Sequence, residues 1–164
     1  MSPNLQAELK QRKPFRSLEQ EAMLSIARTA ALLEHGAAEA LKPHRITPTQ
    51  YNALRILRGA EPEGLFRNEV RDRLVAQVPD ATRLLDRLEE MRLVRREREG
   101  DDRRFVRNRI TPTGLELLRS LDGVMEALHA RQLSHLGLQK LRMLIELLSE
   151  AREPGRADPS HRTP

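Results

Sequence analysis

The stretch that decides the fold is LVRREREGDDRRFVRNRIT, residues 93–111. In its second half, apolar and basic residues alternate with the two-residue period of a strand: Val106 and Ile110 on one side, Phe105, Arg107 and Arg109 on the other. Leu93-Val94 begins an earlier strand, and Glu99-Gly100-Asp101 supplies a turn between the two. The stretch therefore predicts one arginine-rich β-hairpin in a chain whose other segments have helical periodicity.

Two short helices are predicted directly before this hairpin. RNEVRDRLV, residues 67–75, forms the first, with Val70, Leu74 and Val75 as its inward side. AQVP is a tight connection, and Pro79 opens the second helix, PDATRLLDRLEEM. The apolar stripe of this second helix is formed by Ala81, Leu84, Leu85, Leu88 and Met91. Two short helices followed by a hairpin predict a winged helix-turn-helix.

Longer amphipathic helices flank this module. Ser17 with Gln20 and Thr47 with Gln50 have the spacing of capping boxes, which predicts helices over 18–41 and 48–58. Thr111-Pro112 opens a further long helix, and a last one runs from Leu138 to before Pro154. The first and the last two of these flanking helices are too apolar for one winged module to cover, so they predict a homodimer. The alternative is a monomeric bundle that closes on itself.

The expected fold class is therefore mainly α with a small β-hairpin wing, in which long N- and C-terminal dimerisation helices flank a winged helix-turn-helix. We expect a polar arm over 1–16, a helical dimerisation region over 17–46 and 111–153, the winged module over 47–110, and a disordered tail over 154–164.

Composition narrows the function. Charged residues make up 32% of the 164 residues and the net charge is +5, which favours anionic partners. The chain has no cysteine, its five histidines lack metal-ligand spacing, and no phosphate loop or nucleophile motif is present. We therefore expect no enzyme and no cofactor. No apolar run approaches the roughly 18 residues of a membrane span, so we expect a cytoplasmic protein without a membrane partner.

Three segments resemble the MarR family of transcription regulators: ITPTQYNALRILRG, VPDATRLLDRLEEMRLVRR and DDRRFVRNRITPTG. They are similar to the family's second helix, its recognition helix and its wing, in the same order. RKPFRSLEQEA also resembles the N-terminal extension of one branch of that family. Two positions depart from the pattern. Arg92 stands where glycine commonly ends the recognition helix, so either Arg92 takes a left-handed conformation at a cost of about 1 kcal/mol or the helix end frays differently. Arg67-Asn68 replaces the usual Ser or Thr cap.

The recognition helix has outward polar residues near its start, where side chains reach base edges in a major groove. These candidate major-groove contacts are Asp80, Thr82, Arg83 and Arg87. The alternative is a solvated helix face in which acids and arginines pair with each other. We assign Asp86 to that alternative.

The hairpin tip supplies the candidate minor-groove contacts. The resemblance implies that Arg104 enters the groove while Asp102 orients it, and that Arg103 lies at a phosphate. The alternative is a polar hairpin in solvent. Asn68 is either the cap of its helix, which we favour, or a phosphate contact.

These features predict a homodimeric, sequence-specific DNA-binding repressor on a pseudo-palindromic site, with DNA affinity modulated by a small molecule. The alternatives are a helical protein-interaction module and a regulator without effector. The resemblance implies an effector pocket between the dimer helices and the winged module. Tyr51 and His44 are the candidate residues with ring side chains to line it. The residues identify neither the effector, the operator nor the sign of regulation.

Overall fold

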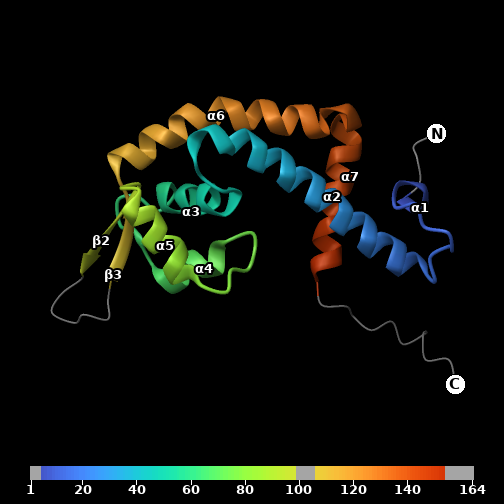
Figure 1. Cartoon of the computed structure of the whole chain (residues 1–164), viewed down its shortest axis with the longest axis horizontal. Helices are drawn as coiled ribbons and strands as arrows, with labels where there is room; N and C mark the ends of the chain where they lie inside the picture. The colour runs from blue at the N-terminus through green and yellow to red at the C-terminus, as the bar shows by residue number, and fades with distance from the viewer. Residues whose placement is uncertain (1–4, 99–105, 154–164) are drawn as a thin grey trace, which may run out of the picture. The chain divides into compact units, whose positions relative to one another are not determined.

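The computed structural model describes residues 5–98 and 106–153, which form seven α-helices, two 3-10 helices and three short strands (Figure 1). The chain divides into two compact units, Met1–Met125 and Glu126–Pro164. The helices are α1 Leu5–Glu8, α2 Leu18–Leu41, α3 Pro48–Arg58, α4 Arg67–Arg73, α5 Ala81–Glu90, α6 Pro112–Leu133 and α7 Gly137–Arg152, with η1 Lys42–His44 and η2 Ser134–Leu136 between them. The strands are β1 Leu65–Phe66, β2 Val94–Arg98 and β3 Val106–Ile110. The mainly helical fold with a small sheet is confirmed; the predicted tail over 154–164 lies outside the described residues.

Side-chain caps begin the first two long helices. The Thr47 hydroxyl accepts from Gln50 N at 3.2 Å, and Gln50 Oε1 accepts from Thr47 N at 2.9 Å, so this capping box is confirmed. At α2, Ser17 accepts from Gln20 N at 3.2 Å, but Gln20 Oε1 binds the amide of Arg16 instead of Ser17. At α2, the bond from the backbone to the Gln20 side chain therefore comes from Arg16, one residue before the donor that a capping box predicts.

The sheet has three antiparallel strands in the order β1-β3-β2. Val94 faces Ile110 in the β2–β3 pair, as the hairpin prediction requires. β1 was not predicted, because two residues are too short to display an alternating pattern. In β3, Asn108 lies opposite Leu65 of β1. Asn108 is 2% exposed, and its side chain donates through Nδ2 to Leu65 O at 3.1 Å. The buried amide thus fastens β1 to the hairpin.

The helix-turn-helix differs from its prediction at both inner ends. α4 ends at Arg73, and Val75, predicted to point inward, is 91% exposed. The amide of Val75 is held by Asn52 Oδ1 of α3 at 2.9 Å, in a turn whose preceding residue, Leu74, is extended. α5 begins at Ala81 instead of Pro79, because the Asp80 carboxylate caps it and leaves the proline outside the helix.

The core of the first unit joins α3, α4 and α5 to the sheet and to α6, as Figure 1 shows for the winged module. Its fully covered side chains include Leu54, Leu57, Val70, Val94, Leu85, Leu88, Leu118 and Leu121. Gly114 lies where α6 leaves the sheet. A Cβ there would stand 2.4 Å from Leu93 O and 2.7 Å from Ile110 Cγ1, so this close approach requires glycine.

Much of the predicted apolar stripe on α2 is exposed in the single chain. Leu41 is buried, whereas Leu18 is 81% exposed and Ile26 is 46% exposed. In the second unit, α7 leaves Leu138 78% exposed and Ile145 66% exposed. Each unit therefore carries a helix whose apolar residues one chain does not cover.

Candidate nucleic-acid interface

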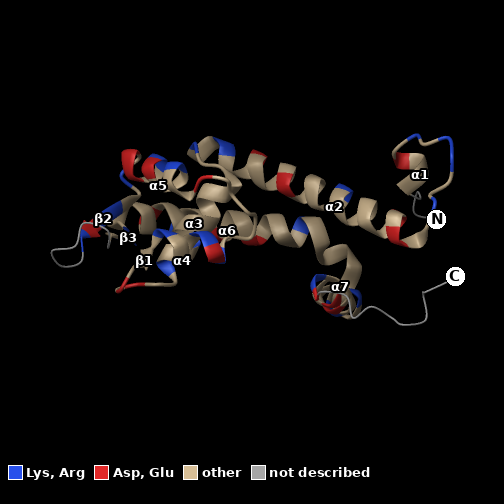
Figure 2. Cartoon of the chain, turned by 90° about the horizontal axis from the view of Figure 1, so that it is seen from below, with Lys and Arg blue, Asp and Glu red and all other residues tan. Residues whose placement is uncertain are grey.

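Helix α5 separates a buried side from a charged one. Ala81, Leu85 and Leu88 face the core, while the side chain of Arg83 is 89% exposed and that of Arg87 is 67% exposed. Figure 2 shows basic and acidic residues beside one another on this helix. The arrangement presents hydrogen-bonding side chains on a rigid helix whose other side is anchored, which is what reading base edges requires.

Asp80 has a structural task besides its predicted one. Its Oδ1 accepts from the backbone N of Arg83 at 3.0 Å, and its Oδ2 lies 3.5 Å from Arg83 Nε. The first contact satisfies one free amide of the helix start, and the second restrains the guanidinium. Contact of either residue with bases stays a prediction.

Thr82 contacts an arginine that was not among the predicted contacts. Arg67 Nη1, from the first residue of α4, donates to Thr82 Oγ1 at 3.1 Å. The two residues are 15 positions apart, and only the docking of α4 on α5 brings them together. The one signal in the sequence was that Arg67 occupies a position where a capping residue was expected.

Ion pairs hold the recognition helix to the wing. Asp86 contacts Arg96 of β2, and Arg96 Nε lies 3.4 Å from Glu89 Oε2. Arg87 Nη1 donates to Glu90 Oε2 at 2.8 Å on the exposed side of the helix. Asp86 therefore pairs with an arginine, as we assigned it, but its partner lies on the neighbouring strand.

Asn68 is not the cap of α4. The residue before the helix is Phe66, whose amide donates to Glu69 Oε2 at 2.8 Å, and Asn68 is the second residue of the helix with an exposed side chain. The favoured capping interpretation is wrong because Glu69 reaches back to the first free amide. A phosphate contact by Asn68 stays a prediction.

The predicted wing-tip contacts Asp102, Arg103 and Arg104 lie outside the described residues. At the base of the wing, Arg95 and Arg109 are directly opposite each other, and Glu97 contacts both, with its Oε2 2.6 Å from Arg109 Nε. That contact is a charge pair without hydrogen-bond alignment. Like charges placed opposite in a sheet repel, so Glu97 stabilises the strands that lead to the tip.

Arg107 and a nearby hollow complete the outer surface of the module. The Arg107 guanidinium lies over the Phe66 ring, 4.3 Å from its centroid, a cation–π contact between β3 and β1. A hollow of about 450 Å³ opens between α4, α5 and the sheet. It is lined by Phe66, Arg67, Asn68, Thr82, Leu85, Arg96, Val106 and Asn108.

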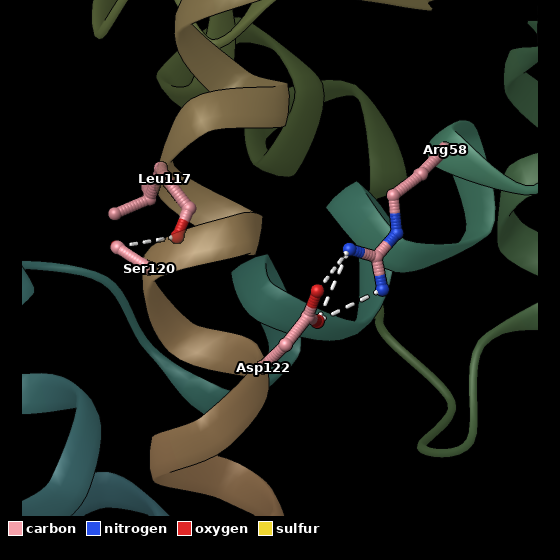
Figure 3. A network of polar contacts seen from close by, with 4 residues as sticks. All are labelled: Arg58, Leu117, Ser120 and Asp122. Atoms are coloured by element: carbon pink, nitrogen blue, oxygen red, sulfur yellow. Dashed lines mark hydrogen bonds and ion pairs between the residues drawn. The ribbon is translucent and has the colours of Figure 1, made fainter.

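A two-pronged ion pair ties the winged module to α6 (Figure 3). Arg58 Nη1 donates to both carboxylate oxygens of Asp122, at 3.1 and 3.0 Å, and Nη2 donates to Oδ1 at 3.1 Å. These hydrogen bonds lower the pKa of Asp122 below its ordinary value and raise the pKa of Arg58. The contact joins the last residues of α3 to the middle of α6, 64 positions away.

The described residues contain neither a candidate metal site nor a membrane-spanning helix. Within residues 5–98 and 106–153, no group of three His, Asp or Glu side chains is placed to hold a metal ion. No helix in the part of the chain that the structure describes is long and apolar enough to cross a membrane.

Comparison with known proteins places this geometry in a family. The MarR family model matches residues 45–104. The MarR transcription factor from Planctomyces limnophilus is 39% identical, with 84% of this chain and 99% of that chain covered and a TM-score of 0.65. The chain belongs to the MarR family of transcription regulators. Members of this family are DNA-binding regulators and not enzymes, so the predicted family and the expected absence of an enzyme are confirmed.

Two other solved structures share the fold at lower identity. The MepR–DNA complex of S. aureus is 20% identical, covers 79% of this chain and 94% of that chain, and has a TM-score of 0.72. Bordetella bronchiseptica BpsR, described with a mechanism for regulation of its DNA binding by 6-hydroxynicotinic acid, is 18% identical, with coverage of 87% and 100% and a TM-score of 0.74.

The departure at Arg92 has a structural counterpart. Arg92 adopts a φ of 59°, the left-handed conformation that glycine favours. Its amide donates to Glu89 O at 2.8 Å, and the amide of Leu93 donates to Leu88 O at 3.0 Å. This pair of bonds is a Schellman motif, and the buried side chains of Leu88 and Leu93 supply its apolar contact. Of the two outcomes open at this position, the left-handed residue is the one found, and the helix ends by the glycine-type route although the residue is arginine.

Proposed function

We propose that this MarR-family regulator is a homodimeric, sequence-specific repressor that acts in the cytoplasm and whose DNA affinity a small molecule modulates. The observation that carries the proposal is helix α5. It is anchored by Leu85 and Leu88 and presents Thr82, Arg83 and Arg87 outward from an ordered N-terminal cap. An anchored helix with exposed donors at its start fits a major groove.

The exposed apolar side chains support the homodimer. α2 exposes Leu18, Met23, Ile26 and Leu32, and α7 exposes Leu138, Met143, Ile145 and Leu147. Apolar residues repeated along a helix are buried in a stable protein, and a second copy is the economical cover. In a two-fold dimer the recognition helices enter successive major grooves, so we expect a pseudo-palindrome with half-sites roughly 10 bp apart or a near multiple.

Regulation by a small molecule rests on the family. BpsR has the same fold and a ligand-regulated DNA affinity, as its description states, which supports an effector for this chain. In the described structure the Asp86–Arg96 pair joins the recognition helix to the wing, and the Arg58–Asp122 pair joins α3 to α6. A ligand that favours one arrangement of these elements would shift DNA affinity by its differential binding to the two states.

One observation favours the alternative of a protein-interaction module. Arg83 and Arg87 both face carboxylates in the free chain, which is how solvated surface arginines are arranged. The two functions differ in their salt dependence. Phosphate binding releases counterions, so the logarithm of the affinity falls linearly with the logarithm of the salt concentration, whereas solvated charges produce no such slope.

Selection from random duplexes, followed by footprinting, tests the proposal. A selected pseudo-palindrome protected over two half-sites, with a salt-dependent affinity, is the expected result. Titration with the Arg83→Ala and Arg87→Ala variants links that site to α5. A single asymmetric footprint, or selection of no sequence, would contradict the proposal. Repressor activity is then measured on a reporter that carries the selected site.

A further inference from the structure

Arg67 has a charge arrangement that the other arginines of the helix-turn-helix lack. α4 and α5 contain five arginines between them. Four of these face a carboxylate: Arg71 with Asp72 at 2.9 Å, Arg73 with Glu69 at 4.0 Å, Arg83 with Asp80 at 3.5 Å, and Arg87 with Glu90 at 2.8 Å. Arg67 is exposed and, among the described residues, forms no ion pair; its partner is the Thr82 hydroxyl.

This difference matters for binding a polyanion. A carboxylate beside an arginine neutralises part of its charge and repels an approaching phosphate, so the net gain of that arginine on binding phosphate is reduced. Among the described residues no carboxylate pairs with Arg67, and one of its five N–H donors is occupied by Thr82. The planar fork of a guanidinium allows the remaining donors to bind phosphate while the first contact is kept.

The contact also sets the polarity of Thr82. A hydroxyl has one hydrogen to donate and two lone pairs to accept with. Because Arg67 Nη1 donates to Thr82 Oγ1, one lone pair is used and the hydroxyl hydrogen is directed elsewhere. The adjacent positive charge opposes the approach of a second donor. Thr82 is thereby set to donate, and the major groove offers acceptors at guanine O6 and N7, adenine N7 and thymine O4, whereas cytosine offers the N4 donor.

We propose that Arg67 is a DNA-contacting residue that both binds a backbone phosphate and orients the Thr82 hydroxyl as a donor, so that Thr82 prefers an acceptor base edge and disfavours cytosine. Arg67, Asn68 and Thr82 all line the hollow between α4, α5 and the sheet, so these three side chains border the same open space. This inference rests on the proposed DNA-binding function and adds a residue to its reading face.

The test uses the full chain and the duplex selected by the wild type, with each base pair replaced in turn. Four variants are compared: Arg67→Ala, Arg67→Lys, Thr82→Val, which removes the hydroxyl at similar size, and Thr82→Ser, which keeps it. Arg71→Ala is the matched control, since it removes an arginine of the same helix that already faces a carboxylate. Thermal unfolding of each variant establishes that it is folded.

We expect Arg67→Ala to weaken binding to cognate and random duplexes alike and to reduce the log–log salt slope by about 0.9 for each Arg67 that binds a phosphate. Arg71→Ala should leave the slope nearly unchanged. At one base pair per half-site, the wild type should disfavour cytosine by about 2- to 10-fold, the worth of one hydrogen bond. Arg67→Ala and Thr82→Val should both lose this preference, and Thr82→Ser should keep it. Arg67→Lys should keep the salt slope of the wild type, because lysine also binds phosphate, but should lose part of the base preference.

Three results would overturn the inference. The first is an Arg67→Ala variant with unchanged slope and base preference. The second is an Arg71→Ala variant with the same loss of slope as Arg67→Ala. The third is a change of preference by Arg67→Ala and Thr82→Val at different base pairs. In all three the wild type still selects a site, so the proposed function stands. A wild type that selects no sequence overturns both together.

Discussion

Arg92→Gly should stabilise the protein, because arginine at this position holds a backbone conformation that glycine adopts without strain. Arg92 has a φ of 59° at the end of the recognition helix. The left-handed conformation costs an L-residue about 1–2 kcal/mol, and glycine avoids that cost. Glycine also increases the entropy of the unfolded chain, which costs about 0.5–1 kcal/mol. The expected net gain in the free energy of unfolding is about 0.5–1 kcal/mol.

The surrounding contacts survive this substitution. The two Schellman hydrogen bonds and the bond from Thr111 Oγ1 to Arg92 O at 2.7 Å involve only backbone atoms of residue 92. For a chain of this size, a gain of 1 kcal/mol raises Tm by about 2–4 °C, so we expect a rise of about 1–4 °C. Urea titration at one fixed protein concentration measures the free energy directly and removes the effect of association.

Arg92→Ala is the control, since it removes the same charge and side chain but keeps the Cβ that makes the left-handed conformation costly. We expect Arg92→Ala to be no more stable than the wild type. If Arg92→Gly and Arg92→Ala had equal stabilities, the stabilisation would come from the lost side chain, and the reasoning from backbone conformation would be refuted.

Three other changes test the remaining contacts. Asp122→Asn should destabilise the protein at neutral pH, because Arg58 lowers the pKa of this carboxyl from its ordinary 3.8. The difference in unfolding free energy between wild type and variant should be present above about pH 4 and should decrease as pH falls through the lowered pKa. Urea titrations at pH 7 and pH 3 measure this difference. Arg83→Ala should reduce the binding free energy for the cognate duplex by about 1–3 kcal/mol and relax the base preference at one base pair per half-site. Arg104→Ala should weaken binding to all duplexes and lower the salt slope. If Arg83→Ala weakened binding to cognate and random DNA equally, this division of roles would be refuted. Deletion of everything after Gly137 should abolish the dimer; sedimentation equilibrium would contradict this by showing the mass of two truncated chains.

Much of the local architecture follows from residues that lie within four positions of each other. Thr47 and Gln50 form their predicted capping box, and the period-two pattern of 106–110 becomes β3. At Arg92 the sequence left two outcomes, a left-handed residue or a frayed helix end, and the structure has the first. These features could be predicted because caps, turns and periodicity depend on interactions within one turn of helix or one hairpin.

The candidate site depends on contacts across longer separations. Val75 fitted a helical pattern but is exposed, because α4 ends at Arg73 and the amide of Val75 donates to Asn52 Oδ1 of α3. The partners of the site arginines were likewise not readable. Arg96 meets Asp86 across the join of strand and helix, Arg67 meets Thr82 across 15 positions, and Arg58 meets Asp122 across 64.

The composition of the chain determines that arginines and carboxylates are abundant, and its periodicity determines which of them face outward. Which arginine stands opposite a carboxylate and which opposite a hydroxyl depends on how helices and strands pack. A displacement of a few ångströms exchanges one neighbour for another, while the apolar pattern that drives the packing stays the same. The contact between Arg67 and Thr82, and the absence of a carboxylate partner for Arg67 among the described residues, are therefore properties of the packed α4–α5 pair, and neither helix has them alone.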